Sequence, residues 1–313
     1  MLSESAGNVG APPASEPPSR GLVVTSTLAT LGCSAGLGSI VVRRWRRAAF
    51  WLGLEVALYA VSIAGILAVR PSLMWAGIIA ALGIRIPAAV DAYRLARRSV
   101  EVASWRVLIA AWLVLTIGPV VLAAGVIRPF VVEAFQIPSK SMYPTLLVGD
   151  HIFVDKLHRA PHRGDVVVFR NPPDPSVDYA KRVVALAGDT VGISEGKLVI
   201  NGVELPLERV QEDCPKGPDG FTAYEDSIPC ILSTETLDGR KYTIGTPTVL
   251  RKFEPIVVPP GHVFVLGDNR DNSSDSRVFG PVPLANVKGV VLFIWWSRGP
   301  SGVRWDRVGL PGA

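Results

Sequence analysis

The chain shows two patterns of hydrophobicity, with long apolar runs in its first half and short alternating segments in its second. The apolar runs cover residues 21–42, 49–69, 73–90 and 107–127, and each approaches the roughly 20 residues that a helix needs to cross a bilayer. From residue 150, apolar and polar side chains alternate with the period of a β-strand. The pattern predicts an N-terminal multi-span α-helical membrane region followed by an all-β extramembrane domain, either a partly closed barrel or packed sheets.

These patterns divide the chain into three predicted parts. Residues 1–20, rich in Ser, Pro, Gly and Ala, predict a disordered tail. Residues 21–129 predict a membrane region of about four helices, and residues 130–313 a β-rich domain. A cleaved signal peptide is the alternative for residues 21–42, although their continuous apolar character and the arginines behind them favour a span. Arg85, inside the third run, is either a functional intramembrane charge or, as we favour, a side chain that snorkels to the cytoplasmic surface.

Seven strands follow from the alternation, and Asn201-Gly202 predicts a tight hairpin turn between two of them. The predicted strands are 151–156, 165–170, 179–186, 197–200, 248–253, 262–266 and 287–295.

Composition and charge support a membrane protein. Of all residues, 49% are hydrophobic and 19% are charged, and this charged fraction is below the value of about 25% that is usual in soluble proteins. The high apolar content excludes a disordered chain and a small disulfide scaffold. Residues 1–130 carry 12 Arg, no Lys and 5 acidic residues, whereas the remainder carries 20 basic and 22 acidic residues. The second part therefore has no basic face for nucleic acid.

The arginines also predict an orientation. They cluster at residues 43–47 and 94–106, and positive clusters beside membrane spans lie in the cytoplasm. Four spans then place both chain ends and the β domain on the extracytoplasmic side of the plasma or inner membrane.

Cysteine and histidine suggest a disulfide but no metal site. Cys214 and Cys230 lie in a loop-rich stretch, so a disulfide is expected outside the cytoplasm, with two free thiols as the alternative. His151, His158 and His162 occupy a strand and its following loop without ligand spacing, and we interpret them as surface residues. No metal and no cofactor is expected.

Three segments carry candidate chemistry, and the first is 137–146. Two prolines restrain the backbone around Ser139 and Ser141, and a rigid loop can hold a hydroxyl nucleophile, which needs a base to become reactive. A polar linker with helix-capping serines is the alternative.

The second segment, 178–189, offers a base. Strand alternation places Lys181 on the same largely apolar face as Tyr179, with Arg182 on the opposite face. Desolvation lowers the pKa of a lysine, and the neutral amine can act as a general base. A lysine at a sheet edge with its ammonium in water is the alternative. Lys140 is a poorer candidate for the base, because the side chains of adjacent residues such as Lys140 and Ser141 usually point apart. Lys156 remains a second candidate.

The third segment, 267–277, follows an apolar strand and combines many hydrogen-bonding side chains in one turn. Such a loop can brace itself through Asp/Arg pairs while a serine orients an amine. An ordinary solvated turn is the alternative.

In this order behind a membrane span, these segments resemble those of type I signal peptidases (leader peptidases), over about residues 130–297. Four ordered boxes of that family are matched by residues 138–146, by 149–156, by 163–169 together with 179–189, and by 267–280. The resemblance implies a serine endopeptidase in which Ser141 is the nucleophile and Lys181 the general base. It also implies an oxyanion hole made by the Ser139 hydroxyl and the Ser141 backbone N–H.

The resemblance further implies supporting and substrate-binding residues. Ser273 would orient the lysine, and the other supporting residues would be Arg182, Gly267, Asp268, Asn269, Asp275 and Arg277. Residues near the small apolar substrate pockets would be Ile137, Pro138, Met142, Leu146, Tyr179 and Ala180. The family's substrates are exported precursors with small residues, typically Ala, at positions −3 and −1 of the cleavage site. The implied partners are such precursors and the bilayer.

The sequence departs from the family at a few positions. Lys140 stands where Gly is common, and Ala180 and Ala185 differ from the usual residues. Three other functions stay open. The first is a related Ser/His peptidase that uses His151 or another histidine. The second is a non-catalytic membrane protein that binds exported chains or assembles a complex, and the third is a peptidase with one dedicated substrate.

Overall fold

The computed structural model describes residues 20–98, 103–122, 125, 128–157, 160–211, 231–246 and 251–309. The described residues form two compact units. The first comprises those of 1–63 and 74–121 and is helical; the second comprises those of 64–73 and 122–313 and is mainly β-structure. The disulfide expected between Cys214 and Cys230 falls outside the described residues, so it remains a prediction, as do the domain boundaries at residues 20 and 129.

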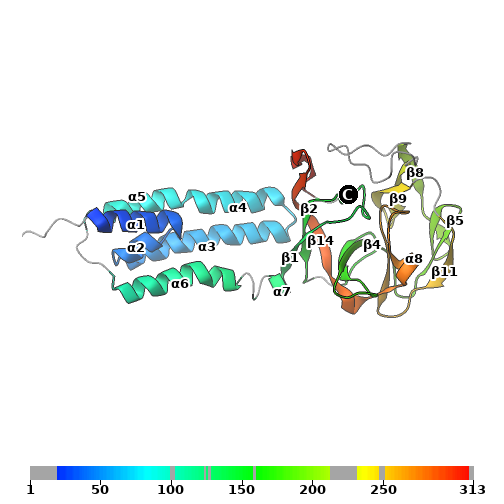
Figure 1. Ribbon diagram of the computed structural model, residues 1–313, viewed down its shortest axis with the longest axis horizontal. Helices are drawn as coiled ribbons and strands as arrows, with labels where there is room; N and C mark the ends of the chain where they lie inside the picture. The colour runs from blue at the N-terminus through cyan, green and yellow to red at the C-terminus, as the bar shows by residue number, and fades with distance from the viewer. Residues whose placement is uncertain are drawn as a thin grey trace, which may run out of the picture. The chain divides into compact units, whose positions relative to one another are not determined.

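The described helices of the first half lie mainly within the predicted apolar runs (Figure 1). They are α1 (Arg20–Gly32), α2 (Leu37–Val41), α3 (Trp45–Leu67), α4 (Pro71–Gly83), α5 (Arg85–Ala96) and α6 (Trp105–Leu122). Two stretches, Trp45–Ile66 and Pro71–Ala96, are long and apolar enough to cross a membrane. The number of spans and their orientation remain predictions.

Residues 21–42 form a helical hairpin where the pattern predicted one continuous span. At 13 residues, α1 is only about 20 Å long, which is shorter than a bilayer core. The chain then turns, and α2 packs back against α1: the Gly38 amide donates to Thr30 Oγ1 at 3.0 Å. A Cβ at Gly38 would collide with this hydroxyl and with the Ser26 carbonyl, so the close packing of the hairpin requires a glycine.

Arg85 pairs with a carboxylate inside the helical unit. Its guanidinium donates to Glu55 Oε1 at 2.9 Å, and Glu55 is only 5% exposed. The second carboxylate oxygen of Glu55 accepts from the Ser34 hydroxyl at 2.7 Å and from the Ala35 amide at 3.0 Å. This cluster therefore holds the turn of the α1–α2 hairpin against α3. Neither interpretation of Arg85 predicted its ion pair with Glu55.

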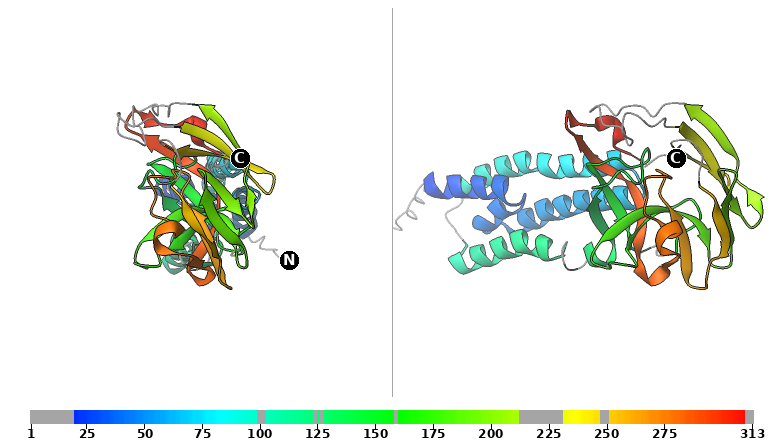
Figure 2. Two further views of the ribbon diagram at one scale, coloured as in Figure 1. Left: turned by 90° about the vertical axis from the view of Figure 1, so that its right-hand side faces the viewer. Right: turned by 45° about the vertical axis from the view of Figure 1, so that its right-hand side comes forward.

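The second unit contains one large antiparallel sheet and two smaller sheets. The strands of these sheets are twisted, as Figure 2 shows. A single turn, α7 (Arg128–Phe130), leads into it. The large sheet has the order β1-β2-β14-β3-β4-β12-β13 with β15 beside β14. Its strands are β1 (Val132–Gln136), β2 (Asp150–Asp155), β3 (Val166–Arg170), β4 (Asp178–Leu186), β12 (His262–Leu266), β13 (Val282–Pro283), β14 (Val287–Gly299) and β15 (Gly302–Val303).

The smaller sheets have the orders β11-β5-β6-β7 and β10-β9-β8. Their strands are β5 (Thr190–Ser194), β6 (Lys197–Ile200), β7 (Val203–Glu204), β8 (Leu207–Gln211), β9 (Ile231–Leu237), β10 (Arg240–Thr246) and β11 (Phe253–Val257). The short helices are α8 (Ser276–Phe279), η2 (Leu284–Asn286) and η3 (Trp305–Arg307).

The predicted all-β character of this unit is confirmed, and most predicted strands match β2, β3, β4, β6, β12 and β14. The Asn201-Gly202 turn joins β6 to β7 with positive φ at both residues, 51° and 80°, as a tight hairpin turn requires. Of the expected strand 248–253, residues 248–250 lie outside the described residues, and residues 251–252 are not in a strand, since β11 begins at Phe253. The β8-β9-β10 sheet was missed because polar Thr, Ser and Glu interrupt the apolar alternation in β9.

Buried apolar clusters among the described residues support the sheet. One of them, which includes Ile137, Met142, Leu146, Ile152 and Ile294, packs beneath the loop between β1 and β2. This loop contains the paired serines, and its anchoring to the core keeps them in a defined place.

Candidate active site

The loop after β1 holds Ser141 by its backbone and by buried side chains. The Ile137 amide donates to the Asp150 carbonyl at 2.8 Å, and Met142 is 1% exposed. Ser141 itself is half-buried, and its hydroxyl lies 3.1 Å from the Ser139 hydroxyl. The rigid serine loop predicted from the two prolines is therefore also anchored through its neighbours.

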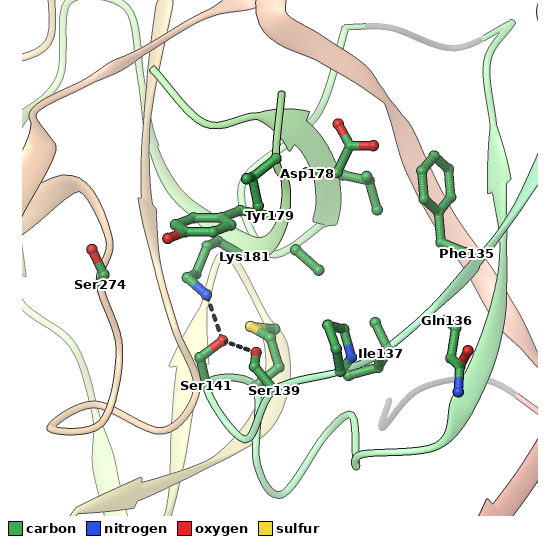
Figure 3. A pocket seen from close by; sticks show the side chains of 14 residues that line it. Phe135, Gln136, Ile137, Ser139, Ser141, Asp178, Tyr179, Lys181 and Ser274 are labelled. Carbon is green, nitrogen blue, oxygen red and sulfur yellow. Dashed lines mark hydrogen bonds between the residues drawn. The ribbon is translucent and has the colours of Figure 1, made fainter. Parts of the chain in front are cut away.

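Lys181 extends from β4 to the Ser141 hydroxyl. Its Nζ donates to Ser141 Oγ at 2.5 Å, as the dashed line in Figure 3 marks. The residue is 3% exposed, and burial lowers the pKa of Lys181 to about 8. The carboxylates of Asp275 and Asp268 oppose this shift, whereas the Arg277 charge adds to it. A large share of this amine is thus neutral at mildly alkaline pH.

Ser141 and Lys181 line one end of a cavity of about 320 Å³ (Figure 3). The lining residues are Phe135, Gln136, Ile137, Pro138, Ser139, Ser141, Met142, Val168, Val177, Asp178, Tyr179, Ala180, Lys181 and Ser274. Five of the six residues assigned to substrate pockets therefore lie in its wall. Leu146 differs: it is fully buried in the cluster beneath the loop and is not in the lining.

Arg182 points to a different set of partners from Lys181, as strand alternation predicts. Its guanidinium donates to both oxygens of Asp268 at 2.8 and 2.7 Å and to the Gly164 carbonyl at 2.7 Å. Thr145 donates to the same carboxylate at 2.5 Å. Through Asp268, β4 is therefore tied both to the loop after β12 and to the serine loop.

The 267–277 loop braces itself and contacts the serine loop. Asp275 caps α8 and accepts from the Gly267 amide at 2.9 Å and from Arg277 Nε at 2.8 Å. The Asn269 amide donates to the Ser141 carbonyl at 3.1 Å, and its side chain donates to the Lys140 carbonyl at 3.1 Å. The braced loop, rather than the solvated turn, matches this geometry.

Ser273 lies beside Gly267 in the loop after β12. Its hydroxyl is buried and has no hydrogen-bond partner among the described residues. It lies against Gly267, where a Cβ would collide with Ser273 Oγ and with the Ser141 carbonyl. The role of Ser273 in orienting the lysine stays a prediction.

A buried ion pair beside the loop was not found from the sequence. Arg270 donates to both oxygens of Glu235 at 2.9 and 2.5 Å, with the two side chains 0% and 1% exposed. Tyr242 donates to the same carboxylate at 2.5 Å, and its ring lies 4.1 Å from the Arg182 guanidinium carbon. Glu235 lies in a polar segment that contains no recognisable motif, so the sequence does not predict its ion pair. The pairing of β9 with β10 places Glu235 beside Arg270.

The other basic candidates lie elsewhere. Lys156 donates to Glu133 at 2.8 Å, His151 packs edge-on against the Trp295 ring, and His262 contacts the Pro260 carbonyl. None of these three lines the cavity. Within the described ranges, no three His, Cys, Asp or Glu side chains gather as a metal would require.

The arrangement suits acyl transfer. It combines a hydroxyl, an amine that can be neutral, and a second hydroxyl within hydrogen-bond distance of the first. The adjoining cavity has mainly apolar walls, so it fits small apolar side chains of an extended chain.

Comparison with known proteins places this geometry in context. The sequence model described as signal peptidase, peptidase S26, matches residues 109–296. A signal peptidase I of Pseudomonas aeruginosa is 38% identical over 208 residues, 57% of this chain and 70% of that protein. A signal peptidase I of Aquifex aeolicus is 35% identical over 207 residues, in an alignment that covers 57% of this chain and 81% of that protein. A crystal structure of a signal peptidase I from Enterococcus faecalis V583 matches with 33% identity over 42% of this chain and 95% of that one, at a TM-score of 0.25.

Proposed function

This chain belongs to the signal peptidase family, peptidase S26, a family of serine peptidases that remove signal peptides, and on that premise we propose that it cleaves exported precursors with a serine–lysine dyad. Ser141 is the nucleophile and Lys181 is the general base. The observation that carries the proposal is the 2.5 Å contact between Lys181 Nζ and Ser141 Oγ at one end of a mainly apolar cavity.

The first half of the reaction forms an acyl-enzyme. Neutral Lys181 accepts the hydroxyl proton as Ser141 Oγ attacks the scissile carbonyl carbon. The carbonyl oxygen becomes an oxyanion, which the Ser139 hydroxyl and the Ser141 backbone N–H stabilise by donating hydrogen bonds. Collapse of the intermediate breaks the C–N bond, and the protonated Lys181 gives its proton to the leaving amine.

The second half releases the signal peptide. Water attacks the ester carbonyl while neutral Lys181 accepts one of its protons. The Ser141 oxygen leaves and regains a proton from the lysine, and the signal peptide departs with a new carboxyl terminus. The enzyme returns to its starting state without a cofactor.

The cavity supports a preference for small side chains at positions −1 and −3. An extended substrate presents alternate side chains to one surface, so residues −1 and −3 point together into the cavity. Ile137, Met142 and Ala180 supply apolar wall there. Alanine fits such a surface without a polar group that would be buried unpaired.

The helices support an integral membrane location, with the β domain on the extracytoplasmic side. Three helical segments, α3, α4–α5 and α6, cross the bilayer in this proposal, and the α1–α2 hairpin enters and leaves on one side. Arginines at 43–47 and 94–106 then lie in the cytoplasm. The partners are signal-bearing precursors and the bilayer, where shared anchoring raises the effective concentration of the substrate.

The test is cleavage of a precursor with an Ala-X-Ala site by the purified full-length protein in detergent, beside Ser141→Ala and Lys181→Ala. Cleavage at that site by the wild type alone supports the proposal. Activity that survives in Lys181→Ala would move the base elsewhere, as in a Ser/His peptidase. No cleavage by the wild type would favour a dedicated substrate or a binding role.

A further inference from the structure

The cavity has two chemically different ends. Ser141 and Lys181 lie together at one end, and Asp178 and Phe135 lie on the other side of the cavity from them (Figure 3). Among the described residues that line the cavity, Asp178 alone is acidic. It begins β4, whereas Phe135 belongs to β1. An unpaired carboxylate here would attract cationic side chains and disfavour apolar ones.

Lys288 is not among the lining residues, but it contacts both Asp178 and Phe135. Its Nζ donates to Asp178 Oδ2 at 2.6 Å and lies 5.4 Å from the centre of the Phe135 ring. One ammonium on β14 thus connects the wall made by β4 with the wall made by β1. The side chains of Lys288 and Asp178 are 23% and 28% exposed, so solvent screens this pair less than it screens a surface pair.

In the proposed binding mode, the geometry of an extended chain assigns the distal end of the cavity to substrate position −3. Attack at the −1 carbonyl places the −1 side chain beside Ser141. In an extended chain the next side chain on the same face is two residues away, about 6.6 Å further along. Position −3 therefore faces the end of the cavity that Asp178 and Phe135 form.

We propose that Lys288 is a specificity-determining residue, which neutralises Asp178 and thereby makes this enzyme select an uncharged side chain at position −3. The inference rests on the proposed function and deepens it. Lys288 acts through Asp178 and takes no part in the bond-breaking steps. Its removal exposes a carboxylate that binds a cationic side chain at position −3.

The experiment measures kcat/KM of the purified full-length protein for three precursors that differ only at position −3, which is Ala, Lys or Glu. In Lys288→Met, the Lys/Ala ratio of kcat/KM is expected to rise at least about fivefold over the wild type. Adding Asp178→Asn to that variant should return the ratio to the wild-type value. Lys288→Arg, which keeps the charge, should behave as the wild type.

Asp178→Asn alone tests the same pair from the other side. It frees the Lys288 ammonium, so the Glu/Ala ratio is expected to rise. This variant keeps the proposal testable if Lys288→Met does not fold, which unfolding temperatures will reveal. Lys197→Met is the matched control because Lys197 pairs with Glu204 on the exposed β6–β7 hairpin, outside the cavity lining.

Two results would overturn the role of Lys288. One is a Lys/Ala ratio in Lys288→Met within about twofold of the wild type, and the other is a raised ratio that Asp178→Asn does not reverse. Failure of the proposed function looks different, because the wild type would then not cleave even the Ala precursor.

Discussion

The main-chain amide of Asn269 donates a hydrogen bond to the carbonyl of Ser141 at 3.1 Å. This contact joins the loop after β12 to the loop that carries the nucleophile. The Asn269 side chain adds a second bond to the neighbouring Lys140 carbonyl. The position of the Ser141 hydroxyl therefore depends on a loop more than 120 residues away in the sequence.

Gly267→Ala is expected to lower kcat by at least about tenfold, because a misplaced nucleophile loses the benefit of orientation. The added Cβ would meet Ser273 and the Ser141 carbonyl, so the two loops must separate. The measurement is cleavage of an Ala-X-Ala precursor. Gly53→Ala in α3 is the control, since a Cβ there meets no atom within 4 Å. Equal activity of the two variants would show that this close approach is unnecessary.

The cleavage rate is expected to rise with pH and to level off above about 8. Burial lowers the pKa of Lys181 to about 8, and the reaction needs the neutral amine, so at pH 7 only about one tenth of the protein is competent. A pH profile of kcat/KM between pH 6 and 10 provides the measurement. A profile that is flat across that range would argue against a lysine base.

Lys181→Met is expected to raise the free energy of unfolding near neutral pH by roughly 3 kcal/mol, while abolishing activity. The folded-state pKa of Lys181, about 8, lies below the usual lysine value of about 10.4. Between these values the unfolded chain binds more protons, so wild-type stability rises with pH there. The advantage of the variant should therefore shrink from pH 8 to pH 10 in thermal unfolding of the detergent-purified protein. A constant difference across this range would contradict the shifted pKa.

Glu235→Gln is expected to destabilise the β domain by about 3–5 kcal/mol, because it leaves the fully buried Arg270 charge without its carboxylate. Thermal unfolding of the full-length protein tests this expectation. Glu204→Gln serves as the control, since it breaks an exposed pair with Lys197 and should leave the unfolding temperature unchanged. Similar unfolding temperatures for the two variants would mean that the buried pair contributes no more than the surface pair.

An epitope tag at the N-terminus is expected on the cytoplasmic side. The α1–α2 hairpin turns the chain back, and the Ala103 amide donates to the Val41 carbonyl at 2.9 Å, which joins its end to the segment before α6. The measurement is protease digestion of the tag in intact spheroplasts and in inverted vesicles. Digestion in spheroplasts would instead support a continuous span over residues 21–42, with both chain ends outside.

The sequence by itself determined the local character of each segment and the identity of the reactive groups. Alternation with period 2 was enough to predict β4 and to place Lys181 and Arg182 on opposite faces, because side-chain direction in a strand depends only on backbone geometry. The order of Ser141, Lys181 and the 267–277 loop was enough to identify the family. The apolar runs were enough to locate α3 to α6, since length and hydropathy are local properties.

Only the tertiary structure decided which distant residues contact one another and how these contacts shift the pKa of Lys181. The pKa of Lys181 depends on its burial and on Asp275 and Asp268, which approach it only when β12 pairs with β4. Glu235 and Lys288 have no motif, and their partners Arg270 and Asp178 lie 35 and 110 residues away. The break in residues 21–42 likewise follows from Glu55 on α3, which binds the turn at Ser34 and Ala35. Contacts between distant segments carry no local pattern, so only the folded chain reveals them.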